Sequence, residues 1–389
     1  MENSSKLSKN VKILGLVSFF NDFASEMVYP IVPIFLTSVL GAPVSLVGLI
    51  EGIAESTASL LRVFSGWLSD RAQKRKIFAV YGYSCSTIAK LIIGTALGWP
   101  LVLLGRFIDR FGKGIRTSAR DALIAESSTP ENMGRAFGFH RALDTAGAVL
   151  GPLAAILLIS YFDNNLRPIF YVAFIPGVIG VLLLLLFIKE KPAAVKSNPP
   201  QFKLANLHPE YKTFLVVSAI FALGNSSDAF LILRAQSLGF STTSTVLAYV
   251  IFNLVYSLLA YSAGSLSDKI GPRKILAGGF FLFALTYLFF GLNQSATWIW
   301  SLFALYGVYM AVTEGISKAY ITQIASTEVI ATSFGAYQTI IGTCTFFSSL
   351  IAGLLWTRIN PSAPFIFGAI LAVAAGTIFV LSGRGKAAS

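Results

Sequence analysis

The sequence predicts an all-α membrane protein of twelve membrane-spanning helices, arranged as two similar six-helix bundles. Three observations support this fold class. The 389 residues are 55% hydrophobic and 12% charged, with a mean hydropathy of +0.71, which is far more apolar than a soluble globular protein. Uncharged apolar runs such as 169–188 and 275–292 reach the roughly 18 residues that a membrane-crossing helix needs. One loop sequence also occurs twice, once in each half of the chain.

The apolar runs divide the chain into twelve segments with short connections. The first run follows the polar residues 1–10 and extends from Val11 to about Leu40. It is far longer than the apolar core of a cleaved signal peptide, so we expect it to remain as the first helix. With helix ends placed to within roughly 2–4 residues, we predict spans at 11–40, 46–69, 77–98, 100–121, 133–161, 168–188, 210–237, 243–266, 275–293, 297–323, 330–357 and 363–383.

One long hydrophilic connector separates six spans from six. It contains three prolines before Leu204 and shows no apolar period, as expected of a linker. We therefore predict an N-terminal six-helix bundle over 1–188, a cytoplasmic linker over 189–209 and a C-terminal six-helix bundle over 210–389.

The net charge of +12 would favour nucleic acid binding in a soluble protein, but here the basic residues lie in alternate loops. They are Lys6, Lys9, Lys12, Arg71, Lys74, Arg75, Lys76, Lys189, Lys191, Lys196, Lys203, Lys269, Arg273, Lys274, Arg384 and Lys386. The opposite loops offer little beyond Arg167 and Arg358. By the positive-inside rule we expect a multi-pass protein of the cell membrane with both termini in the cytoplasm and with no nucleic acid partner.

The sequence predicts no catalytic site, metal site or cofactor. Cys85 and Cys344 both fall inside predicted spans and have no partner at ligand spacing. The stretch F-G-K-G at 111–114 lacks the spacing of a phosphate loop and follows no strand. We find no nucleophile and base at workable spacing, so we do not expect an enzyme.

The repeated loop reads GWLSDRAQKRK at 66–76 and GSLSDKIGPRK at 264–274, with six of eleven positions identical. This internal duplication indicates that one half was copied from the other. The pattern G-x-L-x-D-[RK]-x-x-x-[RK]-[RK] resembles the cytoplasmic signature of the major facilitator superfamily, although Gln73 stands where that family commonly has glycine. The resemblance implies two six-helix bundles that expose a central cavity alternately to each side of the membrane.

In this reading the two loops form a cytoplasmic gate. The glycines are expected to allow close helix approach, and the carboxylates to form a latch with basic residues that is made in one state and broken in the other. Alternatively, the charges only fix the topology. The candidate gate residues are Gly66, Asp70, Arg71, Arg75, Gly264, Asp268 and Arg273.

A second motif lies in the fifth span, where GAVLGPLAA (147–155) resembles the G-x-x-x-G-P motif of the superfamily's antiporters. Gly147 and Gly151 are one helical turn apart and Pro152 can bend the helix. The equivalent stretch of the eleventh span, 342–350, lacks the motif. The resemblance implies export, and the alternative is a plain packing motif.

The fourth span carries a charged stripe. Its residues recur at intervals of mostly three and four, which places them on one helix face, and they are Arg106, Asp109, Arg110, Lys113, Arg116 and Arg120. Charged side chains facing lipid would be costly, so the stripe must face the bundle interior or a wet cavity. Anionic partners are available on other spans, namely Asp22, Glu26, Glu51, Glu55 and Asp144.

Three roles remain open for these charges: a fixed ion-pair network, a site for an anionic substrate group, and control of a carboxylate that carries a coupling proton. The candidate proton-coupling residues are Asp22, Glu26 and Asp144. His140 is more typical of a packed histidine, but it lies beside Arg141 and could line the cavity. The candidate cavity residues are Arg106, Asp109, Arg110, Arg116, His140, Arg141, Asn225, Asp228, Glu314, Lys318, Tyr337 and Gln338.

Together the residues and the resemblance lead us to expect a monomeric secondary active transporter in the lipid bilayer. It would move a small organic molecule by alternating access, in proton-coupled efflux. The excess of arginine on the fourth span keeps open a proton-coupled symporter that imports an organic anion. A membrane receptor or scaffold is the alternative outside transport.

Overall fold

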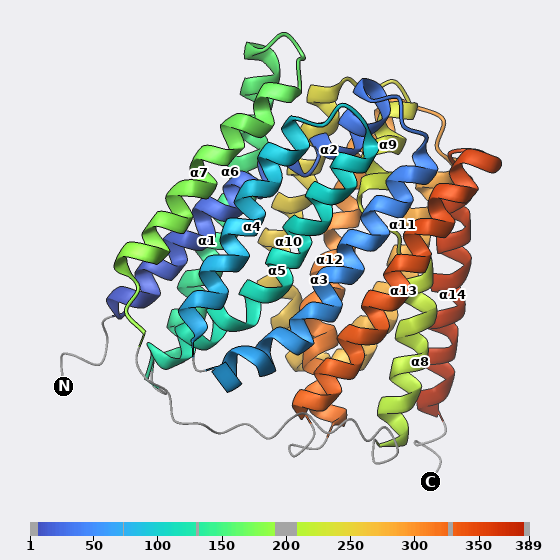
Figure 1. The fold of residues 1–389 in the computed structure, drawn as a ribbon. Coiled ribbons are helices and arrows are strands. Elements are labelled where there is room, and N and C mark those ends of the chain that lie inside the picture. The colour runs from blue at the N-terminus through green and yellow to red at the C-terminus, as the bar shows by residue number, and fades with distance from the viewer. Residues whose placement is uncertain (1–6, 73, 130–131, 191–207, 326–329, 385–389) are drawn as a thin grey trace. The chain divides into compact units, whose positions relative to one another are not determined.

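The computed structural model describes residues 7–72, 74–129, 132–190, 208–325 and 330–384. All regular elements in these ranges are helices, and the ranges contain no strand (Figure 1). By its contacts the chain divides into two compact units, one of residues 1–42 and 53–199 and the other of residues 43–52 and 200–389.

The helices of the first half begin with three consecutive elements that form one interrupted span. In order they are α1 (Lys9–Val28), α2 (Ile31–Ile34), the π-helix η1 (Phe35–Val39), α3 (Val44–Ala72), α4 (Arg75–Gly94), α5 (Trp99–Glu126), α6 (Met133–Tyr161) and α7 (Arg167–Phe187). The first residues of α3 belong to the second unit and the rest to the first.

The helices of the second half begin with another interrupted span. They are α8 (Pro209–Gly224), α9 (Ala229–Ser237), α10 (Thr242–Ile270), α11 (Pro272–Leu292), the short 3-10 helix η3 (Ala296–Trp298), α12 (Ile299–Ile324), α13 (Ile330–Arg358) and α14 (Ala363–Arg384).

The predicted fold class is confirmed. When α1 to η1 are counted as one span and α8 with α9 as another, the helices make up the twelve predicted spans. Within the described residues, ten spans are long and apolar enough to cross a membrane. The other two are α1 and α5, which hold many of the charged residues of the first unit.

Both interruptions have local causes. The first span breaks at Tyr29 and Pro30, although both keep right-handed helical dihedrals, because proline has no backbone N–H to donate to the preceding turn. The seventh breaks after Gly224, where Asn225 leaves helical geometry with φ −94° and ψ 87°. The backbone N–H of Ala229 then donates to Ser227 Oγ at 3.3 Å, a local bond of the kind by which short polar side chains compete with a helix.

Glycines bring α4 and α5 into backbone contact. A Cβ on Gly82 would lie 2.6 Å from the carbonyl oxygen of Gly112, and a Cβ on Gly112 would lie 2.4 Å from that of Gly82. Such close approach requires small residues on both helices. One face of α5 is therefore held against α4, so its charged side chains are enclosed by neighbouring helices.

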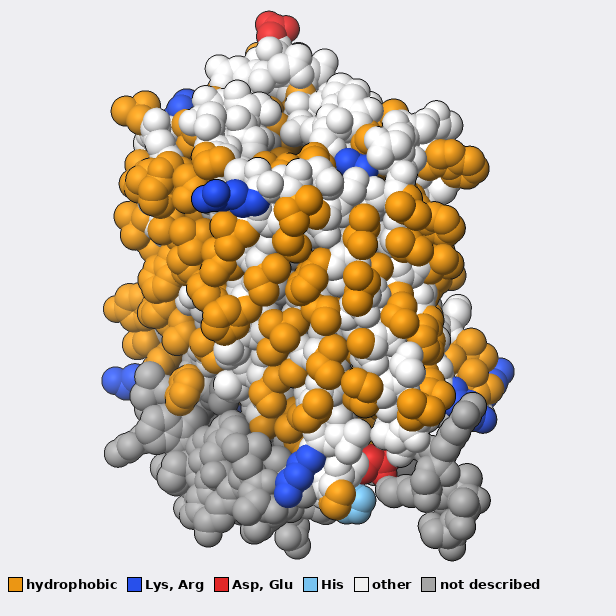
Figure 2. All heavy atoms as spheres, turned by 90° about the vertical axis from the view of Figure 1, so that its right-hand side faces the viewer, with side chains coloured by type: hydrophobic (Ala, Val, Ile, Leu, Met, Phe, Trp, Pro, Cys, Tyr) orange, Lys and Arg blue, Asp and Glu red, His pale blue; other side chains and the backbone are white. Residues whose placement is uncertain are grey.

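The outer surface suits a lipid environment. On the face shown in Figure 2, hydrophobic side chains cover the middle and the visible charged side chains gather toward the two ends. On α14, Ile370 is 62% exposed and Leu381 is 57% exposed. Apolar patches of this extent are rare on soluble monomers and mark contact with a partner or a membrane.

Candidate functional site

Two carboxyl groups meet in the first unit, from α1 and α6. The side chains of Asp22 and Asp144 are hydrogen-bonded to each other. Both oxygens of Asp144 also accept from other donors, Oδ1 from Ser18 Oγ at 2.7 Å and Oδ2 from Arg141 Nη1 at 3.0 Å. A hydrogen bond between two carboxyl groups needs a proton on one of them. The two carboxyl groups are therefore placed to share a proton.

The antiporter-like motif creates this approach. A Cβ on Gly147 would lie 2.5 Å from the carbonyl oxygen of Phe19, and one on Gly151 would lie 2.5 Å from that of Phe23. These glycines let the backbone of α6 touch that of α1 on either side of Asp22. Pro152 is buried within α6 in the same contact region. The motif and the carboxyl pair are thus parts of one helix interface.

The charged stripe of α5 lies in the interior of the first unit. Arg106, Arg110 and Arg116 are only 4%, 7% and 4% exposed. Arg110 Nη2 lies 2.8 Å from Glu55 Oε1, while Arg106 Nη1 lies 3.7 Å from Asp109 Oδ2. The guanidinium groups of Arg106 and Arg110 also lie 5.5 and 5.6 Å from the ring of Tyr29, within the range of cation–π attraction.

The end of the stripe contacts α4. Arg116 donates to Ser86 Oγ and its guanidinium lies 4.7 Å from the ring centre of Tyr83. Further along, Arg120 pairs with Asp121 at 2.8 Å. Much of the stripe is therefore engaged in fixed contacts within its own unit.

Two lysines complete the cluster. Lys113 belongs to the predicted stripe but not to the candidate cavity residues, and Lys90 was not anticipated. Lys90 on α4 is 2% exposed and donates to the carbonyl oxygen of Ser86 at 2.9 Å and to Ser25 Oγ at 3.3 Å. Lys113 on α5 lies in the electrostatic field of Glu55, Asp22 and the neighbouring arginines. Within the described part of the chain, no hydrogen bond or ion pair engages its ammonium group.

The remaining candidates of the first unit flank the carboxyl pair. Glu26 lies one turn beyond Asp22 on α1 and is half-buried. His140 lies one turn before Asp144 on α6 and is 5% exposed, and its Nε2 has no hydrogen-bond partner among the described residues. The side chain of Arg141 is 60% exposed although it pairs with Asp144.

In the second unit, two candidates lie at the break between α8 and α9. Tyr306 donates to Asp228 Oδ1 at 2.7 Å, and Asn225 Nδ2 donates to the hydroxyl oxygen of Tyr309 at 3.1 Å. Ser227, between them, donates to Glu51 Oε2 at 3.4 Å. The break thus gathers a polar cluster inside an aromatic environment.

The other candidates of this unit lie apart from the break. Glu314 and Lys318 are exposed on α12, and Tyr256 donates to Glu314 Oε2 at 2.5 Å. Tyr337 on α13 stacks on Phe214, with ring centres 5.8 Å apart. Gln338, beside it, is half-buried.

The candidate gate residues are only partly described. Gly66, Asp70 and Arg71 lie near the end of α3, and their side chains are outside the described part of the structure. Arg75 forms an ion pair with Glu126 at the end of α5. Asp268 is exposed on α10. Among the described residues, no atom lies within 4 Å of a Cβ built on Gly264, so this glycine makes no close helix contact with them.

Basic residues at the end of the repeated loop bind backbone carbonyls of a distant helix, which the sequence did not reveal. Arg273 Nη2 donates to the carbonyl oxygen of Phe379 at 2.8 Å, and its Nη1 to Glu210 Oε1 at 3.1 Å. In the first unit, Lys76 Nζ donates to the carbonyl oxygens of Leu185 at 2.8 Å and Ile188 at 2.7 Å. In each unit a cation at the start of the third span therefore donates to one or two backbone carbonyls in the last two turns of the sixth, where the helix dipole favours positive charge.

Comparison with known proteins identifies a family of membrane transporters. A family model described as Major Facilitator Superfamily matches residues 14–340 and 213–387. An uncharacterized MFS-type transporter of Methanocaldococcus jannaschii is 40% identical over 389 residues, covering 97% of this chain and 96% of the relative. Multidrug resistance protein MdtG of Salmonella schwarzengrund is 27% identical over 284 residues, covering 69% of each chain.

Solved structures share the fold at low sequence identity. The nucleoside transporter NupG is 12% identical with a TM-score of 0.79, covering 96% of this chain and 98% of that one. A POT family transporter in complex with 5-aminolevulinic acid is 12% identical with a TM-score of 0.81, covering 96% of each chain.

Proposed function

The chain belongs to the major facilitator superfamily, and from this premise we propose that it is a proton-coupled exporter of a small organic molecule. Membership makes it a secondary transporter of the membrane. The direction of transport and the coupling ion are our own inferences.

Proton coupling is supported by the carboxyl pair. Asp22 and Asp144 share a hydrogen bond inside the first unit, and cationic side chains of α5 lie close enough to Asp22 to act on it electrostatically, Arg116 and Lys113 among them. A conformational change that moved these cations relative to Asp22 would alternately favour its charged and its neutral form. Such a change would bind a proton on one side of the membrane and release it on the other.

Export is supported by the motif at Gly147, Gly151 and Pro152 and by the relative named as a multidrug resistance protein. The motif packs α6 on α1, the helix that carries Asp22 and Glu26. A change in this packing would move Asp22 relative to Asp144, so a rocking motion of the helices could be linked to protonation.

We also propose that Asp70 and Asp268 take part in a cytoplasmic latch. The ion pair of Arg75 with Glu126 and the contacts of Arg273 lie within single units. We therefore assign these two arginines to the internal stability of each unit rather than to the latch. We further expect both termini in the cytoplasm, because the basic residues concentrate in the loops on the same side of the membrane as the termini. We also expect a monomer.

A proton-coupled symporter that imports an organic anion is the second candidate, and Lys113 favours it. Its ammonium group lies among the buried charges of α5 without a hydrogen bond or ion pair from the described residues. A substrate carboxylate or phosphate could supply that partner.

A thermal-shift panel on purified protein separates the two candidates. It compares organic cations, organic anions and neutral amphiphiles, because a ligand at ~100 times its dissociation constant stabilises the folded state by ~2.7 kcal/mol. Stabilisation by cations or neutral amphiphiles that weakens in Asp22→Asn supports the exporter. Stabilisation by anions that is lost in Arg106→Ala or Arg116→Ala, but not in Asp22→Asn, would replace the exporter with the importer.

A further inference from the structure

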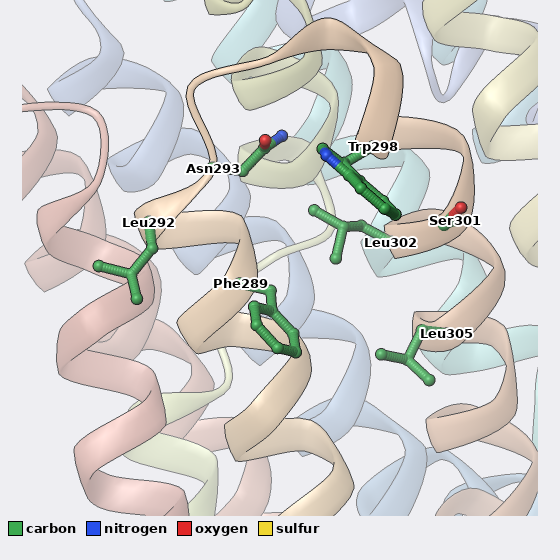
Figure 3. A pocket seen from close by; sticks show the side chains of 7 residues that line it. All are labelled: Phe289, Leu292, Asn293, Trp298, Ser301, Leu302 and Leu305. Atoms are coloured by element: carbon green, nitrogen blue, oxygen red, sulfur yellow. The ribbon is translucent and has the colours of Figure 1, made fainter.

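A groove lies on the second unit where the end of α11 meets η3 and the start of α12 (Figure 3). Its volume is about 590 Å³, within the range of roughly 300–1,000 Å³ that is typical of small-molecule sites. Four apolar side chains form its walls, namely Phe289, Leu292, Leu302 and Leu305. None of the residues considered so far for transport lines it.

The groove is continuous with an apolar surface of a membrane-spanning helix. Both α11 and α12 are long and apolar enough to cross a bilayer. Leu285, Phe289 and Leu292 are 46%, 47% and 58% exposed, and their spacing of four and three residues places them on one helix face. A groove that opens onto such a face is bordered by lipid, so the molecule that fills it comes from the membrane.

The rim of the groove is polar, unlike its walls. Asn293, Trp298 and Ser301 line this end (Figure 3). Trp298 is 64% exposed at the start of α12, and tryptophan is enriched where helices pass from the lipid chains to the headgroups. The rim therefore matches the headgroup level and the walls match the level of the acyl chains.

A buried positive charge lies directly behind the rim. Arg234 on α9 is 4% exposed, and its Nη2 donates to the carbonyl oxygen of Asn293 at 2.7 Å while its Nε donates to that of Phe290 at 3.0 Å. Among the described residues no carboxylate pairs with it. The carbonyl end of α11 offsets only about half a charge, so a positive potential remains at the rim.

We propose that this groove binds a membrane phospholipid. One acyl chain lies along Phe289, Leu302 and Leu305, and the phosphate lies at the rim beside Asn293 and Ser301, where the charge of Arg234 attracts it. The occupied leaflet is the one at the end of α11 that lies away from Arg273 and Lys274.

Photolabelling of the full chain tests this site. The protein is placed in nanodiscs of phosphatidylcholine that contain a trace of phosphatidylglycerol with a diazirine at the end of one acyl chain. After irradiation, the labelled residues are mapped by mass spectrometry. We expect the label to concentrate on 285–305 above the level on other exposed apolar faces. Label spread evenly over those faces would overturn the proposal.

A variant that fills the groove provides the second arm. Ser301 is exposed, so Ser301→Trp can occupy the groove without disturbing the core, and we expect labelling of 285–305 to fall by about tenfold. Leu258→Trp, at a 67% exposed position of α10 outside the groove, should leave it unchanged. Unchanged labelling in Ser301→Trp would contradict a site in the groove.

The role of the rim is tested with a diacylglycerol that carries the same diazirine chain but no phosphate. We expect it to label 285–305 less than the phosphatidylglycerol probe does. Equal labelling by both probes would contradict the phosphate contact and the part given to Arg234.

Discussion

The buried arginines of α5 illustrate how single residues in the membrane are stabilised. Arg110 has a carboxylate at 2.8 Å and an aromatic ring at 5.6 Å, so its charge is compensated on two sides. Removing one member of such a pair leaves the other charged where water solvates it poorly. The resulting loss of stability is larger than the net stability that the pair contributes.

We predict that Arg110→Gln lowers the free energy of unfolding by about 2 kcal/mol, less than for a fully buried pair because the side chain of Glu55 is 30% exposed. The double variant Arg110→Gln with Glu55→Gln should recover much of the loss, since no unpaired charge remains. Thermal unfolding in detergent measures both. Arg358→Gln, at an exposed helix end, is the control and should change stability by less than about 0.5 kcal/mol. Additive losses in the double variant would refute the pairing.

At the scale of a single helix, the interface of α6 with α1 sets the distance between the two carboxyl groups. A Cβ on Gly147 would lie 2.5 Å from a backbone oxygen of α1, whereas no atom of the described residues lies within 4 Å of a Cβ on Gly138 of the same helix. The two glycines are a matched pair, since both lie in α6 and only one of them touches α1.

We predict that Gly147→Ala destabilises the protein by about 1–3 kcal/mol, because the added methyl group pushes the helices apart. It should also reduce proton-driven transport, since the distance between Asp22 and Asp144 grows. Gly138→Ala should be neutral or stabilising by up to about 1 kcal/mol, as alanine favours the helix. Thermal unfolding and vesicle transport measure the two effects. Equal stability of the two variants would show that the contact does not limit the packing.

A second prediction about helices concerns the cations at the start of the third span in each unit, Lys76 and Arg273. We expect Arg273→Met to speed hydrogen exchange in the last two turns of α14 and Lys76→Met to do so at the end of α7, because each removes a donor to backbone carbonyls in that part of the helix. Lys274→Met, at an exposed neighbouring position, is the control. Faster exchange confined to the first turns of α4 and α11, with the ends of α7 and α14 unchanged, would argue against the assigned role.

Much of this helical framework could be predicted from the sequence. The fifth span was placed at 133–161, where α6 lies, and the others within a few residues of the observed helices, because long apolar runs with charged ends leave few alternatives in a membrane. The break after Gly224 was missed, since Asn225 to Asp228 interrupt an otherwise apolar run by only four residues.

The site was less predictable than the helices. Periodicity gave the buried face of α5, but not which neighbour each charge meets. Lys90 was missed because a lone lysine in an apolar helix gives no pattern, and its partners are a backbone carbonyl and a serine hydroxyl of other turns and helices. The contacts of Lys76 and Arg273 with distant helix ends are equally invisible in a sequence, since backbone carbonyls leave no signature.

On the scale of the whole molecule, the two units divide the polar chemistry unequally. The first holds the carboxyl pair and the cations of α5. The second holds the interrupted seventh span, where tyrosines surround Asp228 and Asn225. In our proposal, proton exchange therefore takes place in the first unit.

Proton-driven flux in reconstituted vesicles tests this account most directly. A compound identified in the thermal-shift panel is followed across the membrane, with and without a pH gradient, in the unchanged protein, in Asp22→Asn and in the control Asp163→Asn at an exposed turn. We predict that Asp22→Asn abolishes the response to the gradient but retains exchange of the compound, whereas Asp163→Asn behaves like the unchanged protein. A full response to the pH gradient in Asp22→Asn would contradict proton coupling at the carboxyl pair.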